Sequence, residues 1–334
     1  MKIVQFDAFG PPHEVAACIE APEPKDPGPD EVLVEIEAFP LNPADLLTLE
    51  GRYALRPALP ATLGAEGLGR VVACGSAVRG LAPGDRVLHL GRDNWVQRLT
   101  AKAAALVKVP ADLDPLQLAM LKVNPATALL MLRGYVTLAP GDWLLQDAAN
   151  SGVGTCVIRL ATAAGLKTVN VVRRAELIEP LRALGADVVL LDGPDLAERV
   201  RAETGGAEIR LGLDAVAGPL VDRLAACLAE GGTLVNYGLL SGEPCRIDPH
   251  QLVFRGITLT GFWLAKTLSS SAPERIHSLY EELIGRLRDG TLGVPVEATY
   301  PIEEIKAALE HAGREGRGGK VLVTPNGPLA YSDP

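Results

Sequence analysis

Short runs in which hydrophobic residues alternate with polar ones dominate the first third of the chain. They cover residues 31–38, 69–74 and 86–90, and clusters of glycine and proline such as 26–30 separate them. Alternation with a period of two is typical of strands that bury one face, and the intervening clusters are typical of tight turns. The pattern predicts a twisted β domain that extends to around Val109.

The pattern changes after Leu116. Short apolar runs then alternate with longer stretches in which hydrophobic residues recur at three- and four-residue intervals. The apolar runs are residues 143–147, 168–172, 188–191, 211–214 and 233–237. Repeated strand and helix units of this kind predict a parallel, doubly wound sheet that is covered by helices.

The C-terminal part of the chain mixes both patterns. It contains an amphipathic stretch at 273–289, a strand-like run at 294–298, a helical pattern at 302–313 and a last strand at 320–324. We predict that this tail completes the first domain, which makes that domain discontinuous. The polar, turn-rich residues 326–334 are expected to fray.

The length of 334 residues predicts two domains, at roughly 150 residues per domain. We place residues 1–118 and 268–334 in the β domain and residues 119–267 in the α/β domain. Each domain is long enough to bury a hydrophobic core of its own.

Composition places the chain among ordinary globular proteins, with 48% hydrophobic and 22% charged residues. No apolar run approaches the roughly 20 residues of a membrane span. A net charge of -9 argues against nucleic acid or a membrane surface as partner, because both are bound by basic surfaces. The N-terminus lacks a secretion signal, and the five cysteines are scattered without a CxxC pair, so we expect a cytoplasmic protein with reduced thiols.

A glycine-rich turn follows the apolar run that begins at Trp143. The segment Asn150-Ser151-Gly152-Val153-Gly154 leads into a helical pattern. Such a turn brings backbone N–H groups to a pyrophosphate at the positive end of a helix. The alternative is a turn that serves only close packing of strand and helix.

The next strand of the α/β region ends in Arg173 and Arg174. Proteins that prefer NAD carry an acidic residue near this point, where it binds the 2′-hydroxyl of the ribose. Two guanidinium groups instead favour the 2′-phosphate of NADPH. The alternative is a pair of exposed arginines that begin a surface helix.

Residues 42–84 resemble the medium-chain dehydrogenase/reductase superfamily, and the resemblance extends over essentially the whole chain. It implies a GroES-like β domain that precedes and follows a Rossmann domain. The zinc-dependent branch carries a cysteine and a histidine ligand where Asn42 and Ala65 stand here, and only Glu66 remains of its GHE triplet. The five histidines form no cluster with metal-ligand spacing, so we predict no metal.

Four segments resemble the enoyl thioester reductases within this superfamily: GRY at 51–53, KVNPATA at 122–128, AANSGVG at 148–154 and GFWL at 261–264. This resemblance implies that NADPH reduces the α,β double bond of a 2-enoyl thioester. Leu239, Leu240 and Ala65 depart from residues frequent in that family, which implies an acyl pocket of different shape.

The resemblance also assigns residues to roles. Hydride transfer to the β-carbon leaves an enolate that needs a proton and a hydrogen-bond donor, and a tyrosine hydroxyl can supply either. The implied catalytic residues are Tyr53 and Trp263. The implied cofactor contacts are Asn124, Asn150, Ser151, Gly152, Val153, Arg173, Arg174, Tyr237, Gly238, Leu239, Leu240, Phe262, Trp263, Leu264 and Lys320.

Other interpretations stay open for several of these residues. Tyr53 and Trp263 also fit a packing role, Asn124 fits a helix cap, and Lys320 fits a solvated charge on an edge strand. At the level of function, an NADPH:quinone oxidoreductase shares most of this scaffold. A nucleotide-binding protein without catalysis is a second alternative. Analogy with relatives predicts a homodimer.

The absence of a ligand-spaced cluster generates a first testable prediction. Because neither Asn42 nor Ala65 can bind zinc as cysteine and histidine do, prolonged dialysis against a strong chelator should leave activity and melting temperature unchanged. Elemental analysis checks the same point. One tightly held zinc ion per chain would contradict the prediction.

Overall fold

Short strands bounded by turns give the N-terminal region antiparallel sheets in the computed structural model, which describes residues 1–329. The chain divides into two compact units. Unit 1 contains residues 1–123, 273–288 and the described residues from Gly293 onward, and unit 2 contains residues 124–272 and 289–292. The domain boundaries predicted from the sequence, at 118/119 and 267/268, stay a prediction.

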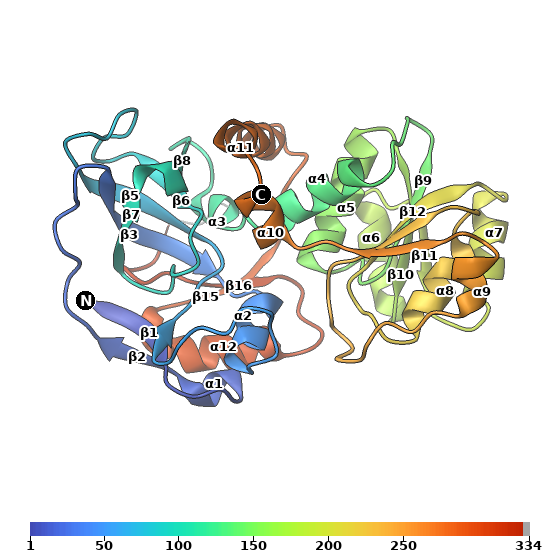
Figure 1. Cartoon of the computed structure of the whole chain (residues 1–334), viewed down its shortest axis with the longest axis horizontal. Helices are drawn as coiled ribbons and strands as arrows, with labels where there is room; N and C mark the ends of the chain where they lie inside the picture. The colour runs from blue at the N-terminus through green and yellow to red at the C-terminus, as the bar shows by residue number, and fades with distance from the viewer. Residues whose placement is uncertain (330–334) are drawn as a thin grey trace. The chain divides into compact units, whose positions relative to one another are not determined.

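Unit 1 contains two sheets, shown in Figure 1. One has the order β2-β1-β4, and the other has the order β15-β16-β3-β5-β6-β8, with β7 also paired to β3. The strands are β1 (Lys2–Phe6), β2 (Ala16–Glu20), β3 (Glu31–Pro40), β4 (Ala61–Thr62), β5 (Gly67–Cys74), β6 (Arg86–His89), β7 (Arg98–Lys102), β8 (Leu106–Val109), β15 (Val296–Tyr300) and β16 (Lys320–Val323).

Helices of unit 1 connect and cover these strands. They are α1 (Pro12–Val15), α2 (Pro43–Leu49), α3 (Pro115–Ala119), α11 (Pro273–Arg288) and α12 (Ile305–Gly313), with short 3₁₀ turns η1 (Ala103–Ala105) and η3 (Ile302–Glu304). The amphipathic α11 buries Tyr280, Leu283 and Ile284, which recur at the three- and four-residue spacing of one helix face.

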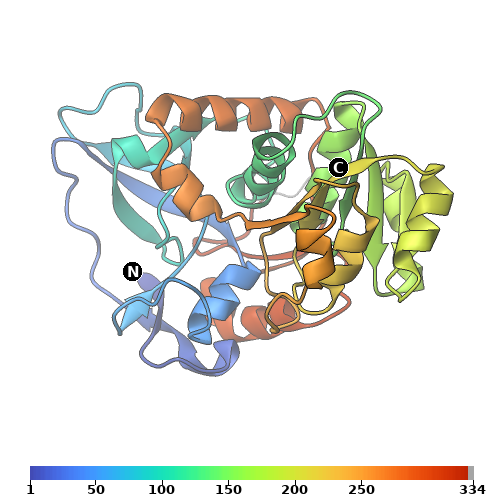
Figure 2. The same ribbon diagram turned by 45° about the vertical axis from the view of Figure 1, so that its right-hand side comes forward.

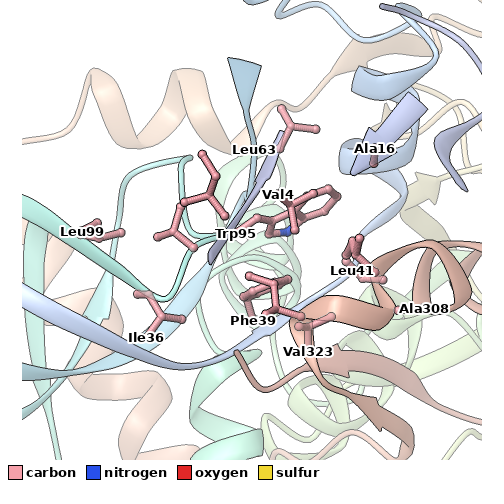
Figure 3. Close-up of a cluster of buried hydrophobic side chains, with 14 of the residues drawn as sticks. Val4, Ala16, Ile36, Phe39, Leu41, Leu63, Trp95, Leu99, Ala308 and Val323 are labelled. Atoms are coloured by element: carbon pink, nitrogen blue, oxygen red, sulfur yellow. The ribbon is translucent and has the colours of Figure 1, made fainter. Parts of the chain in front are cut away.

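The alternation in β3 explains the core of unit 1. Val32, Val34 and Ile36 are fully buried on one side of the strand. At the end of β3 the ring of Phe39 stacks on Trp95, with centroids 5.9 Å apart. Figure 3 shows these two rings among aliphatic side chains from several strands and from α12. Aromatic rings of this size contribute much of the apolar area that a core buries.

Carboxylates occupy the alternate positions of β3. Glu37 accepts from Arg70 Nη2 at 2.8 Å and from Arg86 Nε at 2.7 Å, and Glu35 accepts from Arg98 Nη2 at 2.6 Å. The polar half of the alternating pattern is therefore paired with arginines of β5 and β7, which are neighbours of β3, and of β6, which lies beyond β5.

Unit 2 is a six-stranded sheet in the order β11-β10-β9-β12-β13-β14, and every neighbouring pair is parallel. The predicted parallel, doubly wound sheet is therefore confirmed. Its strands are β9 (Trp143–Gln146), β10 (Lys167–Val172), β11 (Val188–Leu191), β12 (Ile209–Asp214), β13 (Thr233–Asn236) and β14 (Thr258–Gly261).

The helices of unit 2 pack on both faces of this sheet (Figures 1 and 2). Apolar side chains of α7 and α8 form one cluster with the sheet, and those of α5 and α6 form another. The helices are α4 (Asn124–Gly134), α5 (Gly152–Ala163), α6 (Ile178–Ala183), α7 (Leu196–Thr204), α8 (Leu220–Cys227), α9 (Pro249–Val253) and α10 (Leu264–Ser269), with the 3₁₀ turn η2 (Ala175–Leu177).

The C-terminal segment is hydrogen-bonded to the rest of unit 1 at its first residue, and its fraying stays a prediction. Residues 326–334 were expected to fray, yet the side-chain amide of Asn326 donates to the carbonyls of Ile36 and Gln97, both at 2.9 Å. These hydrogen bonds anchor the segment at its start, and their partners are far away in the sequence. Residues 330–334 lie outside the described part. Within that part, no helix has the length and apolar character required to cross a membrane.

The buried aromatic pair generates a stability prediction. Phe39→Ala should lower the free energy of unfolding by about 3–5 kcal/mol, because a fully buried ring leaves a cavity against Trp95. Urea unfolding followed by tryptophan fluorescence measures the change. Val72→Ala on β5, where the side chain is 42% exposed, is the control and should stay within about 0.5 kcal/mol of the parent. Equal effects of the two substitutions would contradict the prediction.

Candidate functional site

The glycine-rich turn of unit 2 connects β9 to α5. Ser151 is the N-cap residue of α5, and its hydroxyl accepts a hydrogen bond from the N–H of Gly154 at 3.1 Å. A Cβ atom on Gly154 would lie 2.6 Å from the carbonyl oxygen of Ala149, so this position requires glycine. The turn thus serves close packing, and it also places the positive end of a 12-residue helix at the end of β9.

The order of the strands makes this turn a candidate ligand site. β9 lies between β10 and β12, and the chain winds in opposite directions from it. Ligands of open parallel sheets bind outside the carboxyl ends of the strands at such a point. The predicted contacts Asn150, Ser151, Gly152 and Val153 all lie in the turn.

Arg173 and Arg174 directly follow β10, which is the neighbour of β9. Because both strands run parallel, the arginines lie at the same edge of the sheet as the glycine-rich turn. Arg173 is exposed and Arg174 is half-buried, with its Nε 3.4 Å from a carboxylate oxygen of Glu176. Arg174 is the N-cap residue of η2, which leads directly into α6, so the start of a surface helix stays an alternative for the pair; the sequence pattern did not predict the acid beside Arg174.

Two further groups of predicted residues follow the strands β13 and β14, at the same edge of the sheet. Leu239 and Leu240 are exposed, whereas Gly238 packs so closely that an added Cβ would lie 2.4 Å from the carbonyl oxygen of Ala215. The residues after β13 are Tyr237, Gly238, Leu239 and Leu240, and those after β14 are Phe262, Trp263 and Leu264. Burial raises the pKa of the Tyr237 hydroxyl. The structure therefore gathers these residues at one edge of the sheet in unit 2.

Asn124 also lies in unit 2, as the first residue of α4. Its side chain is 5% exposed, and its Nδ2 has no hydrogen-bond partner among the residues that the structure describes. A buried amide donor without a partner is costly. This position therefore fits a residue whose partner is a ligand.

Two buried carboxyl groups at this edge were missed by sequence reasoning. Asp147 follows β9 and accepts from the N–H of Ala215 at 2.7 Å, and Asp214 ends β12 and accepts from Asn236 Nδ2 at 2.6 Å. Burial, together with the charge of Asp214, raises the pKa of Asp147 well above its ordinary value. The sequence does indicate these two residues, because each acid stands at the end of an apolar run that predicts a strand.

Tyr53 lies in unit 1, in the turn that follows α2. The backbone N–H groups of Arg52 and Tyr53 both donate to the carbonyl of Leu47, at 2.8 and 3.1 Å, which fixes the backbone of the turn. The ring is half-buried, and the guanidinium carbon of Arg92 lies 5.6 Å from its centroid. A positive charge beside a phenol is a suitable environment for stabilising an oxyanion.

A buried carboxylate, Glu66, lies directly before β5. Its side chain is 0% exposed. One oxygen accepts from Asn42 Nδ2 at 2.8 Å and the other from the N–H of Val123 at 2.8 Å. Burial raises the pKa of Glu66, whereas the charge of Lys320 and these hydrogen bonds lower it.

Lys320 and Lys122 are the cations of this cluster. Lys320 Nζ donates to Asn42 Oδ1 at 2.5 Å, and Lys122 Nζ donates to the carbonyls of Ala65 and Gly91 at 2.5 and 2.6 Å. Burial lowers the pKa of Lys122 to about 8, and the negative charge of Glu66 opposes that shift. Lys122 was not singled out from the sequence, although a lysine within an otherwise apolar stretch is a visible signal.

The alternative interpretation of Lys320 is wrong. Its side chain is only 7% exposed, and β16 lies between β15 and β3, so Lys320 is not a solvated charge on an edge strand. Sequence pattern alone did not show that the last strand is an interior one.

The positions that hold zinc ligands in relatives have other partners here. Asn42 hydrogen-bonds Glu66, and the carbonyl of Ala65 accepts from Lys122. Across residues 1–329 no group of three or more histidine, cysteine, aspartate or glutamate side chains could hold a metal ion. The prediction of a metal-free protein stays a prediction.

The candidate residues of unit 1 and of unit 2 lie in regions that match known protein families. Residues 28–110 match the alcohol dehydrogenase GroES-like domain, and residues 152–282 match the family described as zinc-binding dehydrogenase. With the parallel sheet of unit 2, these matches confirm the predicted combination of a GroES-like domain and a Rossmann domain.

Individual relatives match along nearly the whole chain. A mitochondrial enoyl-acyl-carrier-protein reductase of Arabidopsis thaliana is 35% identical over 331 residues, which are 97% of this chain and 88% of the relative. The quinone oxidoreductase of Escherichia coli, in complex with NADPH, is 27% identical with a TM-score of 0.88 and covers 97% of this chain and 100% of its own.

A third match is the mitochondrial 2-enoyl thioester reductase heterodimer of Candida tropicalis. It is 25% identical, covers 97% of this chain and 99% of its own, and has a TM-score of 0.86. The chain therefore belongs to the medium-chain dehydrogenase/reductase superfamily, in the family of the enoyl thioester reductases.

Proposed function

We propose that this protein reduces the α,β double bond of 2-enoyl thioesters with NADPH. The observation that carries the proposal is the likeness to an enoyl-acyl-carrier-protein reductase over 97% of the chain. Tyr53 in unit 1 and the glycine-rich turn with Arg173 and Arg174 in unit 2 supply the chemistry that such a reaction requires.

The residues of unit 2 fit NADPH. The cofactor, when bound, supplies a hydride. The N–H groups of Gly152 and Val153 at the start of α5 bind its pyrophosphate, Arg173 and Arg174 bind its 2′-phosphate, and the amide of Asn124 donates to it. The further cofactor contacts in this proposal are Asn150, Ser151, Tyr237, Gly238, Leu239, Leu240, Phe262, Trp263, Leu264 and Lys320.

Tyr53 acts on the substrate in this proposal. When the β-carbon of the thioester accepts a hydride, negative charge develops on the thioester oxygen. The Tyr53 hydroxyl donates a hydrogen bond or a proton to the resulting enolate. Trp263 is the second residue that touches the substrate.

A quinone is the alternative substrate, because the structure of a quinone oxidoreductase matches the chain about as well as that of the enoyl thioester reductase. Turnover of crotonyl-CoA and of a small quinone, each with NADPH, separates the two. Turnover of the quinone alone would favour the alternative. Tight NADPH binding without turnover of either would favour a nucleotide-binding protein that has no catalysis.

The assembly and location of the protein complete the proposal. We infer a homodimer, because the Candida tropicalis reductase is a dimer of two chains. We also infer a cytoplasmic location, which the five free cysteines of the structure support. Size-exclusion chromatography with light scattering tests the dimer.

The arginine pair generates a prediction about the cofactor. A charge-assisted hydrogen bond contributes about 1.5–3 kcal/mol, so Arg173→Ala or Arg174→Ala should weaken NADPH binding about 10- to 150-fold and leave NADH binding nearly unchanged. Fluorescence titration with each cofactor measures both constants.

Arg182→Ala is the matched control for the pair, because Arg182 is exposed and already bonded to Glu179 at 2.9 Å. It should change neither constant. If the Arg173 variant lost affinity for NADPH and NADH equally, a damaged fold would be indicated. If neither arginine variant lost NADPH affinity, the assignment of the pair to the 2′-phosphate would be wrong.

A separate prediction concerns Tyr53. Tyr53→Phe keeps the ring but removes its hydroxyl, so kcat with crotonyl-CoA should fall by about 100- to 1,000-fold while KM and NADPH affinity change little. Quinone reduction needs no proton at carbon and should fall much less. Steady-state kinetics with both substrates provide the measurement.

Tyr300→Phe is the control for this substitution. Tyr300 also lies in unit 1, where its hydroxyl is 2.9 Å from His311 Nδ1, and it has no role in the proposed reaction. If Tyr53→Phe and Tyr300→Phe behaved alike, Tyr53 would be a packing residue.

A further inference from the structure

Arg92 is a charged residue beside Tyr53 that neither the sequence motifs nor the proposed function uses. Its guanidinium carbon lies 5.6 Å from the centroid of the Tyr53 ring. The side chain is only half-exposed. A partly desolvated cation acts more strongly on nearby charge than one in bulk water.

No carboxylate pairs with this guanidinium. Among the described residues Arg92 has no hydrogen bond and no ion pair, and the ring of Tyr53 is its close contact. The neighbouring acid, Asp93, lies instead 3.8 Å from His89 Nδ1. The oxygens of Asp45 accept from the backbone N–H groups of Asn42 and Ala65, both at 3.0 Å.

The positive charge of Arg92 nevertheless acts on two groups of the buried cluster around Glu66. Burial raises the pKa of Asp45 and lowers that of Lys122, and the charge of Arg92 acts downward on both pKa values. The buried cluster contains two cations, Lys122 and Lys320, and two acids, Asp45 and Glu66. Arg92 therefore places a positive charge next to the phenol without an ion-pair partner among the described residues.

The loop that carries Arg92 is held from both sides. Lys122 Nζ donates to the carbonyl of Gly91 at 2.6 Å. The side-chain amide of Asn94 donates to the carbonyls of Gly64 and Gly91 at 2.9 and 3.2 Å, and its oxygen lies 3.0 Å from His89 Nδ1. A charge on such an anchored loop needs little rearrangement when it meets a developing charge, which is the condition for electrostatic catalysis.

We propose that Arg92 is a further catalytic residue, whose guanidinium stabilises the enolate oxygen of the substrate together with the Tyr53 hydroxyl. This inference rests on the proposed enoyl thioester reduction. When the β-carbon accepts a hydride, the electron pair of the double bond forms the enolate and places negative charge on the thioester oxygen. A proton from Tyr53, replaced from water, then goes to the α-carbon, and the carbonyl is restored. The Arg92 guanidinium acts through its positive charge and takes no part in the proton transfer.

The test compares three variants in the full-length protein with NADPH and crotonyl-CoA. Arg92→Gln removes the charge, Arg92→Lys keeps it, and Arg52→Gln is the matched control. Arg52 precedes Tyr53 on the same turn, but it is exposed and ion-paired with Glu50 at 2.9 Å. NADPH affinity and melting temperature are measured for every variant.

We expect Arg92→Gln to lower kcat by about 100-fold, the loss typical for one oxyanion-stabilising group, with little change in KM. Arg92→Lys should recover most of that activity, and Arg52→Gln should match the parent. NADPH affinity should stay at the parental value. If Arg92 only packed on the ring, both Arg92 variants would shift the melting temperature and leave kcat unchanged, which would overturn the proposal.

A double variant tests whether Arg92 and Tyr53 act on the same oxygen. In Tyr53→Phe/Arg92→Gln the loss in kcat should be smaller than the product of the two single losses. Independent, multiplicative losses would overturn the shared role. A parent protein that reduces a quinone but not crotonyl-CoA would overturn the proposed function itself, whereas an active parent with an equally active Arg92→Gln variant overturns only the inference.

Discussion

A carboxylate without access to water must be neutralised by groups that surround it, and in unit 1 that carboxylate is Glu66. Asn42, from the turn between β3 and α2, and the backbone of Val123 donate to its two oxygens, and Lys320 reaches Asn42 from β16. Removing one partner of a buried charge leaves the other unpaired at a cost of about 3–5 kcal/mol. These distant segments are therefore held together through two side chains, Glu66 and Asn42.

The same cluster connects the stability of unit 1 with its chemistry. Lys122, which balances Glu66, also binds the carbonyls of Ala65 and Gly91. Gly91 precedes Arg92, and Arg92 lies over Tyr53. A substitution deep in the cluster can therefore alter the position of groups that it does not touch.

Local patterns were sufficient for most of the fold but for only part of the site. The alternation in β3 and the strand and helix units of unit 2 could be read from the sequence because they depend on near neighbours. The glycine-rich turn is local as well, and Gly154 confirms its close packing. Lys122 and Lys320 could not be placed in this way, because a buried lysine is defined by partners such as Ala65 and Asn42 that lie far away in the chain. The hydrogen bonds of Asn326 to Ile36 and Gln97 could not be predicted for the same reason.

The pairing of β16 with the end of β3 has a consequence for the order in which the protein forms on the ribosome. Leu322 pairs with Pro40 and Val323 with Phe39, so this part of the sheet stays unpaired until residues 322 and 323 have been synthesised. All six strands of unit 2 lie between those two segments in the sequence. Unit 2 can therefore fold as the chain emerges, because domains generally fold as units during synthesis. Unit 1 begins first and is completed last, with an exposed strand edge in the interval.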